Sequence, residues 1–335
     1  MRAVRVREFG GPEVLEPAET PTPVAGPGEV VVEAVAGDVL YLDTLLRSGW
    51  GADHFPVRPP YVPGSGVSGR VVEVGDGVDA DLVGTSVLTE TGEINPETGR
   101  TVAPTGGYAE RVTVPETSLI PLPEGASPRE ALATLHDGPL ALMVSDAAPV
   151  EPDTWVLVTA AAGGGGSLLV QLARAAGARV IGAARGQRKL DFVREQGAEF
   201  VVDYSEPGWQ ERARQITGGR GAAVVHDGAG GELGGRAFEA IADGGHMVSY
   251  GSGGGTFAEI DHAEARRRGV RVTGLLDLPA ETGESRRRLV ARALELVAKG
   301  WITPVVGQTF ALERASEAHA ALEGRATVGK TLLVM

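Results

Sequence analysis

Five residues of one short segment have the composition of a nucleotide-binding turn: Ala162, Gly163, Gly164, Gly165 and Gly166. They stand between an apolar strand-like stretch, Trp155 to Thr159, and a helical stretch that begins at Leu168. Glycines let a backbone turn tightly and approach a pyrophosphate without Cβ clashes, and a helix start offers free N–H groups to an anion. A second strand follows, so this order predicts a dinucleotide site; a flexible packing turn is the alternative.

The residues after the second strand bear on which dinucleotide fits. An acidic side chain about 20 residues past the glycine turn would accept a hydrogen bond from the ribose 2′-hydroxyl of NAD. The segment instead carries three cations, Arg185, Arg188 and Lys189. Because cationic side chains suit a 2′-phosphate, we predict NADPH as the cofactor. The alternative is a solvated, charged helix start without a ligand.

The elements that position this turn follow from the surrounding pattern. From Trp155 onward, apolar strands alternate with helical stretches, which predicts an α/β domain with a doubly wound parallel sheet. The expected strands are Trp155 to Thr159, Arg179 to Ala183, Phe200 to Asp203, Ala223 to His226, His246 to Tyr250 and Val270 to Gly274. The first third reads as short strands bounded by turn residues, and Pro304 to Phe310 and Thr331 to Val334 indicate a return to this β-rich part.

Composition narrows the classes of partner. The 335 residues include no cysteine, which removes disulfides, a catalytic thiol and thiolate metal sites. The formal charge of -13 disfavours nucleic acid and anionic membranes as partners. Neither a secretion signal nor an apolar stretch of about 20 residues is recognisable, so we expect a cytoplasmic protein that acts on a small molecule.

Several separate motifs resemble those of the zinc-free quinone oxidoreductases, the zeta-crystallin-like branch of the medium-chain dehydrogenase/reductase superfamily. They lie in the same order: Asp43 to Gly49, Val62 to Gly64, Gly69 to Gly75, the glycine turn, Val201 to Tyr204, Val248 to Gly251 and Ala321 to Lys330. The resemblance implies a GroES-like substrate domain built from residues 1–122 and 300–335. It further implies a Rossmann dinucleotide-binding domain over residues 123–299, and a homodimer.

The resemblance also assigns further cofactor-binding residues. Lys189, Tyr204 and Arg325 occupy the positions that surround the 2′-phosphate in this family. The Tyr-Gly pair at the fifth strand lines the nicotinamide side, which implies roles for Tyr250, Gly251 and Ser252. The alternative for Tyr204 is an ordinary half-buried aromatic at a strand end.

Zinc-dependent relatives would carry a Gly-His-Glu run where this chain has Gly64-Ser-Gly66, so we predict no metal. The chain also departs from its own branch. Leu40, Leu45 and Leu140 stand where the branch has polar residues, and Asp38 replaces a glycine. A more apolar or reshaped pocket is one interpretation, and a decayed site is the other.

The resemblance suggests three candidates for proton transfer. Tyr41 matches the tyrosine of polyketide-synthase enoyl reductases, although a buried structural tyrosine is an equal alternative. His136 and Asp137 fall close to where the family places the reacting ring, and they could bind or protonate a carbonyl. The alternative is a helix-start acid beside a half-exposed histidine.

These observations favour a zinc-independent, NADPH-dependent oxidoreductase that reduces a quinone or an α,β-unsaturated carbonyl compound. One alternative is an enoyl thioester reductase of fatty-acid or polyketide type biosynthesis. A non-catalytic nucleotide-binding or structural protein is the alternative from another class.

Overall fold

A computed structural model describes residues 1–51, 55–94, 101–123, 125–279 and 282–335. The chain forms two compact units. The first unit contains Met1–His136, Glu281–Ala291 and Pro304–Met335, and the second contains Asp137–Ala280 and Arg292–Thr303. The first unit therefore extends as far as His136, beyond residue 122, where the resemblance places the domain boundary.

The second unit is built on a parallel sheet of six strands among the described residues, in the order β12-β11-β10-β13-β14-β15. The strands are β10 (Trp155–Val158), β11 (Arg179–Ala184), β12 (Phe200–Asp203), β13 (Ala222–Asp227), β14 (Ile241–Ser249) and β15 (Arg271–Gly274). All six overlap predicted strands, although β14 begins at Ile241 rather than at His246, so the Rossmann-type α/β prediction is confirmed. The chain order reverses on either side of β10, and ligands of open α/β sheets bind at such a reversal.

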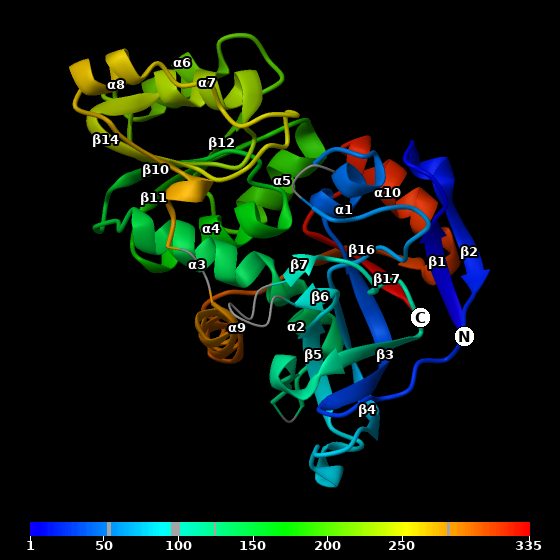
Figure 1. Cartoon of the computed structure of the whole chain (residues 1–335). Coiled ribbons are helices and arrows are strands. Elements are labelled where there is room, and N and C mark those ends of the chain that lie inside the picture. Colours follow the sequence, from blue (N-terminus) through cyan, green and yellow to red (C-terminus); the bar gives the residue numbers. More distant parts are fainter. Residues whose placement is uncertain (52–54, 95–100, 124, 280–281) are drawn as a thin grey trace. The chain divides into compact units, whose positions relative to one another are not determined.

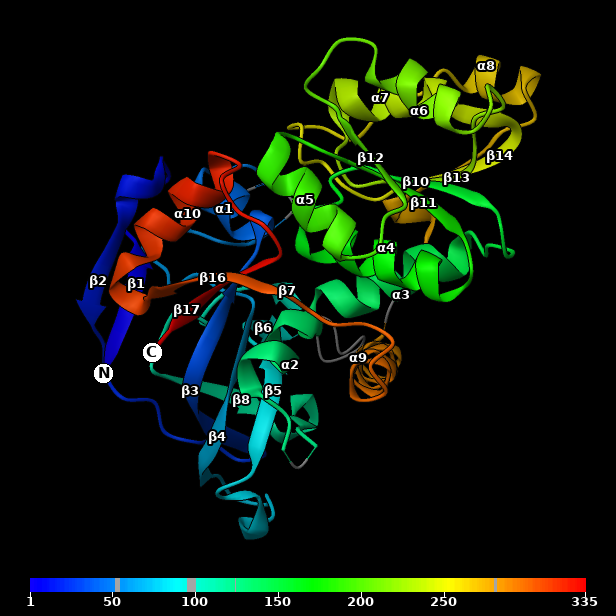
Figure 2. The same ribbon diagram turned by 180° about the vertical axis from the view of Figure 1, so that it is seen from behind.

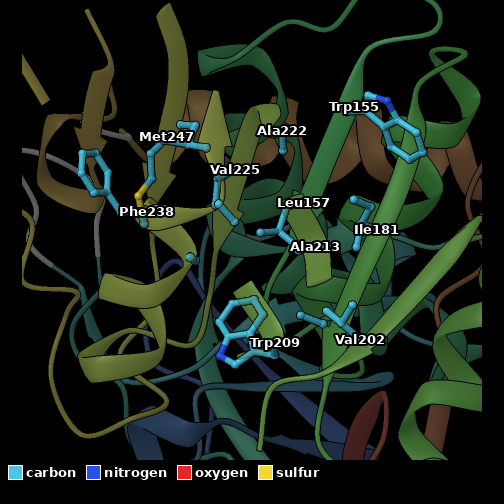
Figure 3. Packing of buried hydrophobic residues seen from close by; sticks show 14 of the residues in the cluster. Trp155, Leu157, Ile181, Val202, Trp209, Ala213, Ala222, Val225, Phe238 and Met247 are labelled. Atoms are coloured by element: carbon cyan, nitrogen blue, oxygen red, sulfur yellow. The ribbon is translucent and has the colours of Figure 1, made fainter. Parts of the chain in front are cut away.

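Helices cover both faces of this sheet (Figure 1). They are α3 (Asp137–Ala147), α4 (Gly164–Ala175), α5 (Gln187–Glu195), α6 (Trp209–Ile216), α7 (Gly231–Glu239) and α8 (His262–Arg267). Trp209 of α6 and Phe238 of α7 pack onto one face, against Leu157 and Val225 of the central strands (Figure 3). All four residues of β10 are buried, as expected for a central strand enclosed on both faces.

The first unit is mainly β. Its larger sheet has the order β16-β17-β3-β4-β5-β9, with β8 also paired to β3. The strands are β3 (Glu29–Val39), β4 (Gly66–Val74), β5 (Ser86–Glu90), β8 (Arg111–Pro115), β9 (Ile120–Pro121), β16 (Val306–Ala311) and β17 (Lys330–Val334). Strand β17 runs antiparallel to β3 (Figure 2), which confirms the predicted return of the chain to its β-rich part.

Smaller elements complete the first unit. Two short pairs are β1 (Arg2–Val6) with β2 (Leu15–Glu19) and β6 (Glu93–Ile94) with β7 (Thr101–Ala103). The helices are α1 (Tyr41–Arg47), α2 (Pro128–Leu135) and α10 (Ala315–Glu323), and α9 (Gly283–Ala298) contributes residues to both units. Within the described ranges, none of the helices combines the length and apolar character needed to cross a bilayer.

Candidate functional site

The glycine turn lies where the sequence predicts it, between the end of β10 and the start of α4. Ala160 has a left-handed φ of 49°, and α4 begins at Gly164 with Gly163 as its N-cap. A Cβ on Gly166 would lie 2.3 Å from the carbonyl oxygen of Ala160, so only glycine permits this turn. At Gly163 a Cβ would meet that oxygen at an ordinary 3.4 Å. A glycine backbone at a helix N-terminus fits a pyrophosphate.

A buried carboxylate fixes the ends of the central strands beneath this turn. Asp227, at the end of β13, accepts hydrogen bonds from the hydroxyls of Thr159 at 2.6 Å and Ser249 at 3.1 Å. It also accepts backbone N–H bonds from Ala229 and Gly230. Burial raises the pKa of Asp227, although these hydrogen bonds to the carboxylate oppose the rise. Asp227 therefore joins three strands at the edge that carries the glycine turn.

Asp137, one of the expected proton-transfer residues, faces the glycine turn. A Cβ on Gly164 would lie 2.0 Å from a carboxylate oxygen of Asp137. A carboxylate at a helix N-terminus is stabilised by the helix dipole, as a phosphate would be. A bound pyrophosphate would thus meet a neighbouring negative charge, which sequence reasoning did not foresee.

The cations after β11 lie at the start of α5. Arg185 and Arg188 are exposed, and Lys189 is partly buried. Sequence reasoning missed Asp203, which reaches this turn from β12 and accepts a 2.8 Å bond from the N–H of Gly186. Burial alone would raise the pKa of Asp203, but hydrogen bonds from Ser205 and Gly186 and the charge of Arg185 hold it below its ordinary value. Since these bonds occupy the Asp203 carboxylate, its evident role is to shape the turn.

The aromatic residues assigned by resemblance occupy strand ends. Tyr204 follows β12 and packs edge-on to Trp209, with ring centroids 6.3 Å apart, so it belongs in part to the core. Tyr250 is buried directly after β14, and burial raises its pKa well above the ordinary value. Gly251 and Ser252 continue into the next loop, and a Cβ on Gly251 would lie 2.2 Å from the carbonyl oxygen of Gly228. Arg325, with a left-handed φ of 54°, belongs to the first unit.

The first unit contains a cluster of three ionisable side chains, which we call the Asp38 cluster: Asp38, His136 and Lys330. Oδ2 of Asp38 lies 2.8 Å from Nδ1 of His136 and 3.1 Å from Nζ of Lys330. The side chain of Asp38 has no solvent exposure, that of Lys330 is 5% exposed and that of His136 is 17% exposed. Burial alone would raise the pKa of Asp38, but Lys330 and His136 outweigh it and lower the pKa to about 2.

A second polar group, the Asp43 network, adjoins this cluster and consists of Asp43, Ser65, Tyr108 and His319. Asp43 accepts hydrogen bonds from the hydroxyls of Ser65 at 3.0 Å and Tyr108 at 3.2 Å. It also accepts the N–H of Leu40 at 2.9 Å, which caps the start of α1. Nε2 of His319 lies 2.8 Å from the Tyr108 hydroxyl, and burial lowers the pKa of His319 to about 3. Tyr108 donates its hydroxyl proton to Asp43, while the direction of its hydrogen bond with Nε2 of His319 depends on the tautomer of the imidazole.

Tyr41, the remaining expected proton donor, is the first residue of α1 and is partly buried. Its carbonyl oxygen accepts a 2.7 Å bond from the Thr44 hydroxyl. Tyr41 and His136 both belong to the first unit, whereas Asp137 belongs to the second.

Sequence reasoning missed Asp38, Lys330, Thr159 and Asp227 as site residues. Asp38 could have been recognised from the sequence as an acidic residue inside the apolar strand Glu29–Val39. Its buried charge also shows that the departures from the family pattern do not all make this region more apolar. Asp227 gave a comparable signal, since an aspartate ends the buried strand Ala222–Asp227.

Two family models match the chain, one for each kind of domain. The model described as "Alcohol dehydrogenase GroES-like domain" matches residues 26–124. The model described as "Zinc-binding dehydrogenase" matches residues 164–283, which begin within the glycine turn and include most of the parallel sheet.

Curated relatives match along the whole chain. A quinone oxidoreductase of Pseudomonas aeruginosa is 30% identical over 339 residues, covering 99% of each chain. A 2-haloacrylate reductase of a Burkholderia species is also 30% identical, over 99% of this chain and 98% of the relative.

Solved structures match equally fully. The Escherichia coli quinone oxidoreductase complexed with NADPH superposes with a TM-score of 0.86 at 28% identity, covering both chains completely. A structure described as an NAD-dependent alcohol dehydrogenase gives a TM-score of 0.87 at 34% identity, again over both full chains.

Proposed function

The chain belongs to the quinone oxidoreductase, zeta-crystallin-like branch of the medium-chain dehydrogenase/reductase superfamily, and on that premise we propose that it is a zinc-independent, NADPH-dependent reductase of quinones or α,β-unsaturated carbonyl compounds. The observation that carries this proposal is the glycine turn before α4. There the close approach of Gly166 to Ala160 builds a bare backbone cradle at the reversal point of the sheet.

The choice of NADPH rests on the cations after β11. Arg185, Arg188 and Lys189 supply positive charge near the ribose position, and Asp203 is already engaged with Gly186 and Ser205. The NADPH complex of the Escherichia coli relative supports the same choice, while the relative described as NAD-dependent makes it necessary to test. We assign Tyr204 and Arg325 to the 2′-phosphate, and Tyr250, Gly251 and Ser252 to the nicotinamide side, by family resemblance.

Bound NADPH supplies a hydride, which the β-carbon of an α,β-unsaturated carbonyl substrate accepts. The resulting enolate then needs a proton at its α-carbon or oxygen. We assign this proton to His136, whose Nδ1 is engaged by Asp38 while its Nε2 lies 3.6 Å from Glu90, beyond normal hydrogen-bond length. Tyr41 is the alternative donor, and we assign Asp137 to the neighbourhood of the pyrophosphate because it faces Gly164.

Zinc independence is supported by the residues available as ligands. The chain has no cysteine. Among the residues that the structure describes, no three histidine or carboxylate side chains are grouped so that they could hold a metal ion. The substrate carbonyl would then be polarised by hydrogen bonding.

The 2-haloacrylate reductase relative supports conjugated carbonyl substrates, as the quinone oxidoreductase relatives support quinones. An enoyl thioester reductase remains the second candidate, because Leu40, Leu45 and Leu140 would suit an acyl chain. We further propose a cytoplasmic homodimer from the family resemblance, which sedimentation of the purified protein would test.

A substrate panel tests the proposal. Oxidation of NADPH is followed with quinones, enones, haloacrylates and enoyl thioesters, with and without a chelator. We expect consumption with at least one conjugated acceptor and no effect of chelation. Cofactor binding without consumption of any acceptor would instead support a non-catalytic binding protein.

A further inference from the structure

The Asp38 cluster has an arrangement that determines the chemistry of His136. One oxygen, Oδ2 of Asp38, contacts both Nδ1 of His136 and Nζ of Lys330. The three side chains come from distant parts of the sequence: the end of β3, the residue after α2 and the first residue of β17. The fold therefore brings these three side chains together, and no local sequence motif predicts that they meet.

The charge on Asp38 is secured by its surroundings. A fully buried carboxylate without a partner would take up a proton, because burial penalises its charged form. Lys330 counters this penalty at 3.1 Å, so Asp38 remains an anion and therefore only accepts hydrogen bonds. A permanent acceptor at Nδ1 requires that His136 keep its proton on that nitrogen.

The ring of His136 is also held sterically. A Cβ built on Gly66 would lie 3.0 Å from Cε1 of His136 and 3.4 Å from Oδ1 of Asp38. The same Cβ would lie 2.5 Å from Cδ2 of Leu135, so there is no room for a side chain at position 66 beside the imidazole. A larger residue at position 66 would meet Leu135 first and then the imidazole.

The opposite ring nitrogen has different neighbours. Oε1 of Glu90 lies 3.6 Å from Nε2 of His136 but only 2.7 Å from the guanidinium of Arg286, which makes Arg286 its closer partner. Nε2 therefore has no short hydrogen bond to Glu90, while Nδ1 is committed to Asp38. The two nitrogens of one imidazole are thereby differentiated.

We propose that Asp38 and Lys330 are positioning residues that hold neutral His136 in the Nδ1–H tautomer, so that Nε2 is the atom that exchanges the proton with the substrate. The inference rests on the proposed function, in which His136 is the proton donor. In the proton-transfer step the Nε2–H bond of the imidazolium breaks and a C–H or O–H bond forms on the substrate enolate. Neutral His136 remains, with its other proton on Nδ1 facing Asp38.

The first test needs no turnover, and it uses a variant only to assign the signal. Nitrogen-15 NMR of the full-length protein with labelled histidine reports which nitrogen of neutral His136 carries the proton, after assignment with His136→Gln. We expect the Nδ1–H tautomer. Finding the Nε2–H tautomer in the wild-type protein would overturn the inference even if the enzyme reduces enones as proposed.

The second test separates positioning from folding. Asp38→Asn is expected to lower kcat about ten- to a hundredfold, within the range that general acid catalysis contributes, and to leave KM within about twofold. The double variant Asp38→Asn/Lys330→Met removes both buried charges together, so it avoids leaving Lys330 unpaired and should show the same loss of kcat. The midpoint of urea denaturation of each variant serves as the folding control.

Lys330→Arg provides rescue, since it keeps a cation beside Asp38, and it should retain more activity than Lys330→Met. Wild-type kcat in Asp38→Asn would contradict the inference while leaving the proposed function intact. Absence of turnover in the wild-type protein would instead reject the proposed function, and the tautomer measurement would then decide the positioning claim alone.

Discussion

The hydroxyl of Thr159 donates a 2.6 Å hydrogen bond to the buried carboxylate of Asp227. The same hydroxyl oxygen accepts the backbone N–H groups of Gly228 and Ala229, each at 3.1 Å. A single small side chain at the end of β10 therefore connects two neighbouring strands directly beside the glycine turn. This bond is a structural precondition for the cofactor cradle, because it fixes the strand end from which the turn departs.

Thr159→Val preserves shape but removes both the donor and the acceptor. The variant leaves the Asp227 carboxylate and the N–H groups of Gly228 and Ala229 without the hydrogen bonds to Thr159. This loss should lower the free energy of unfolding by about 1–3 kcal/mol. Urea denaturation measures this change, and the exposed Thr256→Val is the matched control. Equal stabilities for the two variants would show that this bond contributes nothing.

Gly166→Ala tests the steric requirement of the turn. Its Cβ would lie 2.3 Å from the backbone oxygen of Ala160, so the backbone must shift, at a cost of about 1–3 kcal/mol. Gly163→Ala is the matched control, because its Cβ would meet the same oxygen at 3.4 Å. We expect a clear loss of unfolding free energy and of NADPH affinity for Gly166→Ala, and a much smaller loss of stability for Gly163→Ala. The reverse order would mean that the turn differs from the one described.

Removing the cations after β11 is expected to change the selectivity for NADPH over NADH. Replacing Arg185 and Arg188 by glutamine should raise the dissociation constant for NADPH about tenfold or more and leave that for NADH nearly unchanged, since only NADPH carries the 2′-phosphate. Isothermal titration measures both constants. Arg194→Gln is the control, because Arg194 lies in the last turn of α5, at the opposite end of this helix from Arg188. If the dissociation constants for NADPH and NADH rose by the same factor, the cations would not contact the 2′-phosphate.

We expect the free energy of unfolding to depend on pH through the ionisation of Asp43. Burial, followed by the charge of Asp38, raises the pKa of Asp43 to about 7 from an ordinary value of 3.8. The folded protein thus holds a proton that the unfolded chain releases, so the free energy of unfolding should fall as the pH rises from about 4 to about 7. Asp43→Asn cannot titrate and should lack this fall, which amounts to about 2–4 kcal/mol.

Urea titrations of both proteins at pH 5 and pH 8 check this prediction. The stability of the variant relative to the wild type should improve at the higher pH. Parallel behaviour at the two pH values would show that Asp43 is ionised throughout.

The part of the fold that could be predicted is the part governed by local patterns. The strands of the second unit are short apolar runs between turn residues, and the glycine turn is a contiguous motif, so each could be recognised within about ten residues. The return of the chain to the first unit was also predictable, because Thr331 to Val334 has a strand pattern and now pairs with β3.

The buried polar groups could not be predicted in the same way. Asp38 and Lys330 are 292 positions apart along the chain and meet only because β17 pairs with β3. Asp203 likewise reaches the turn after β11 from the neighbouring strand, so a search for acidic residues at the end of β11 alone overlooked it. Single residues of this kind carry no periodic signal, and their partners are set by sheet register.

The central claim is that the chain delivers a hydride from NADPH to carbon and a proton from a protein side chain or solvent. Mass spectrometry of the product formed from an enone tests it most directly, with NADPH deuterated at the transferred position of C4. We predict one deuterium at the β-carbon from the labelled cofactor, and one at the α-carbon when unlabelled NADPH is used in deuterated water. Product without deuterium at the β-carbon in the first experiment would contradict the account.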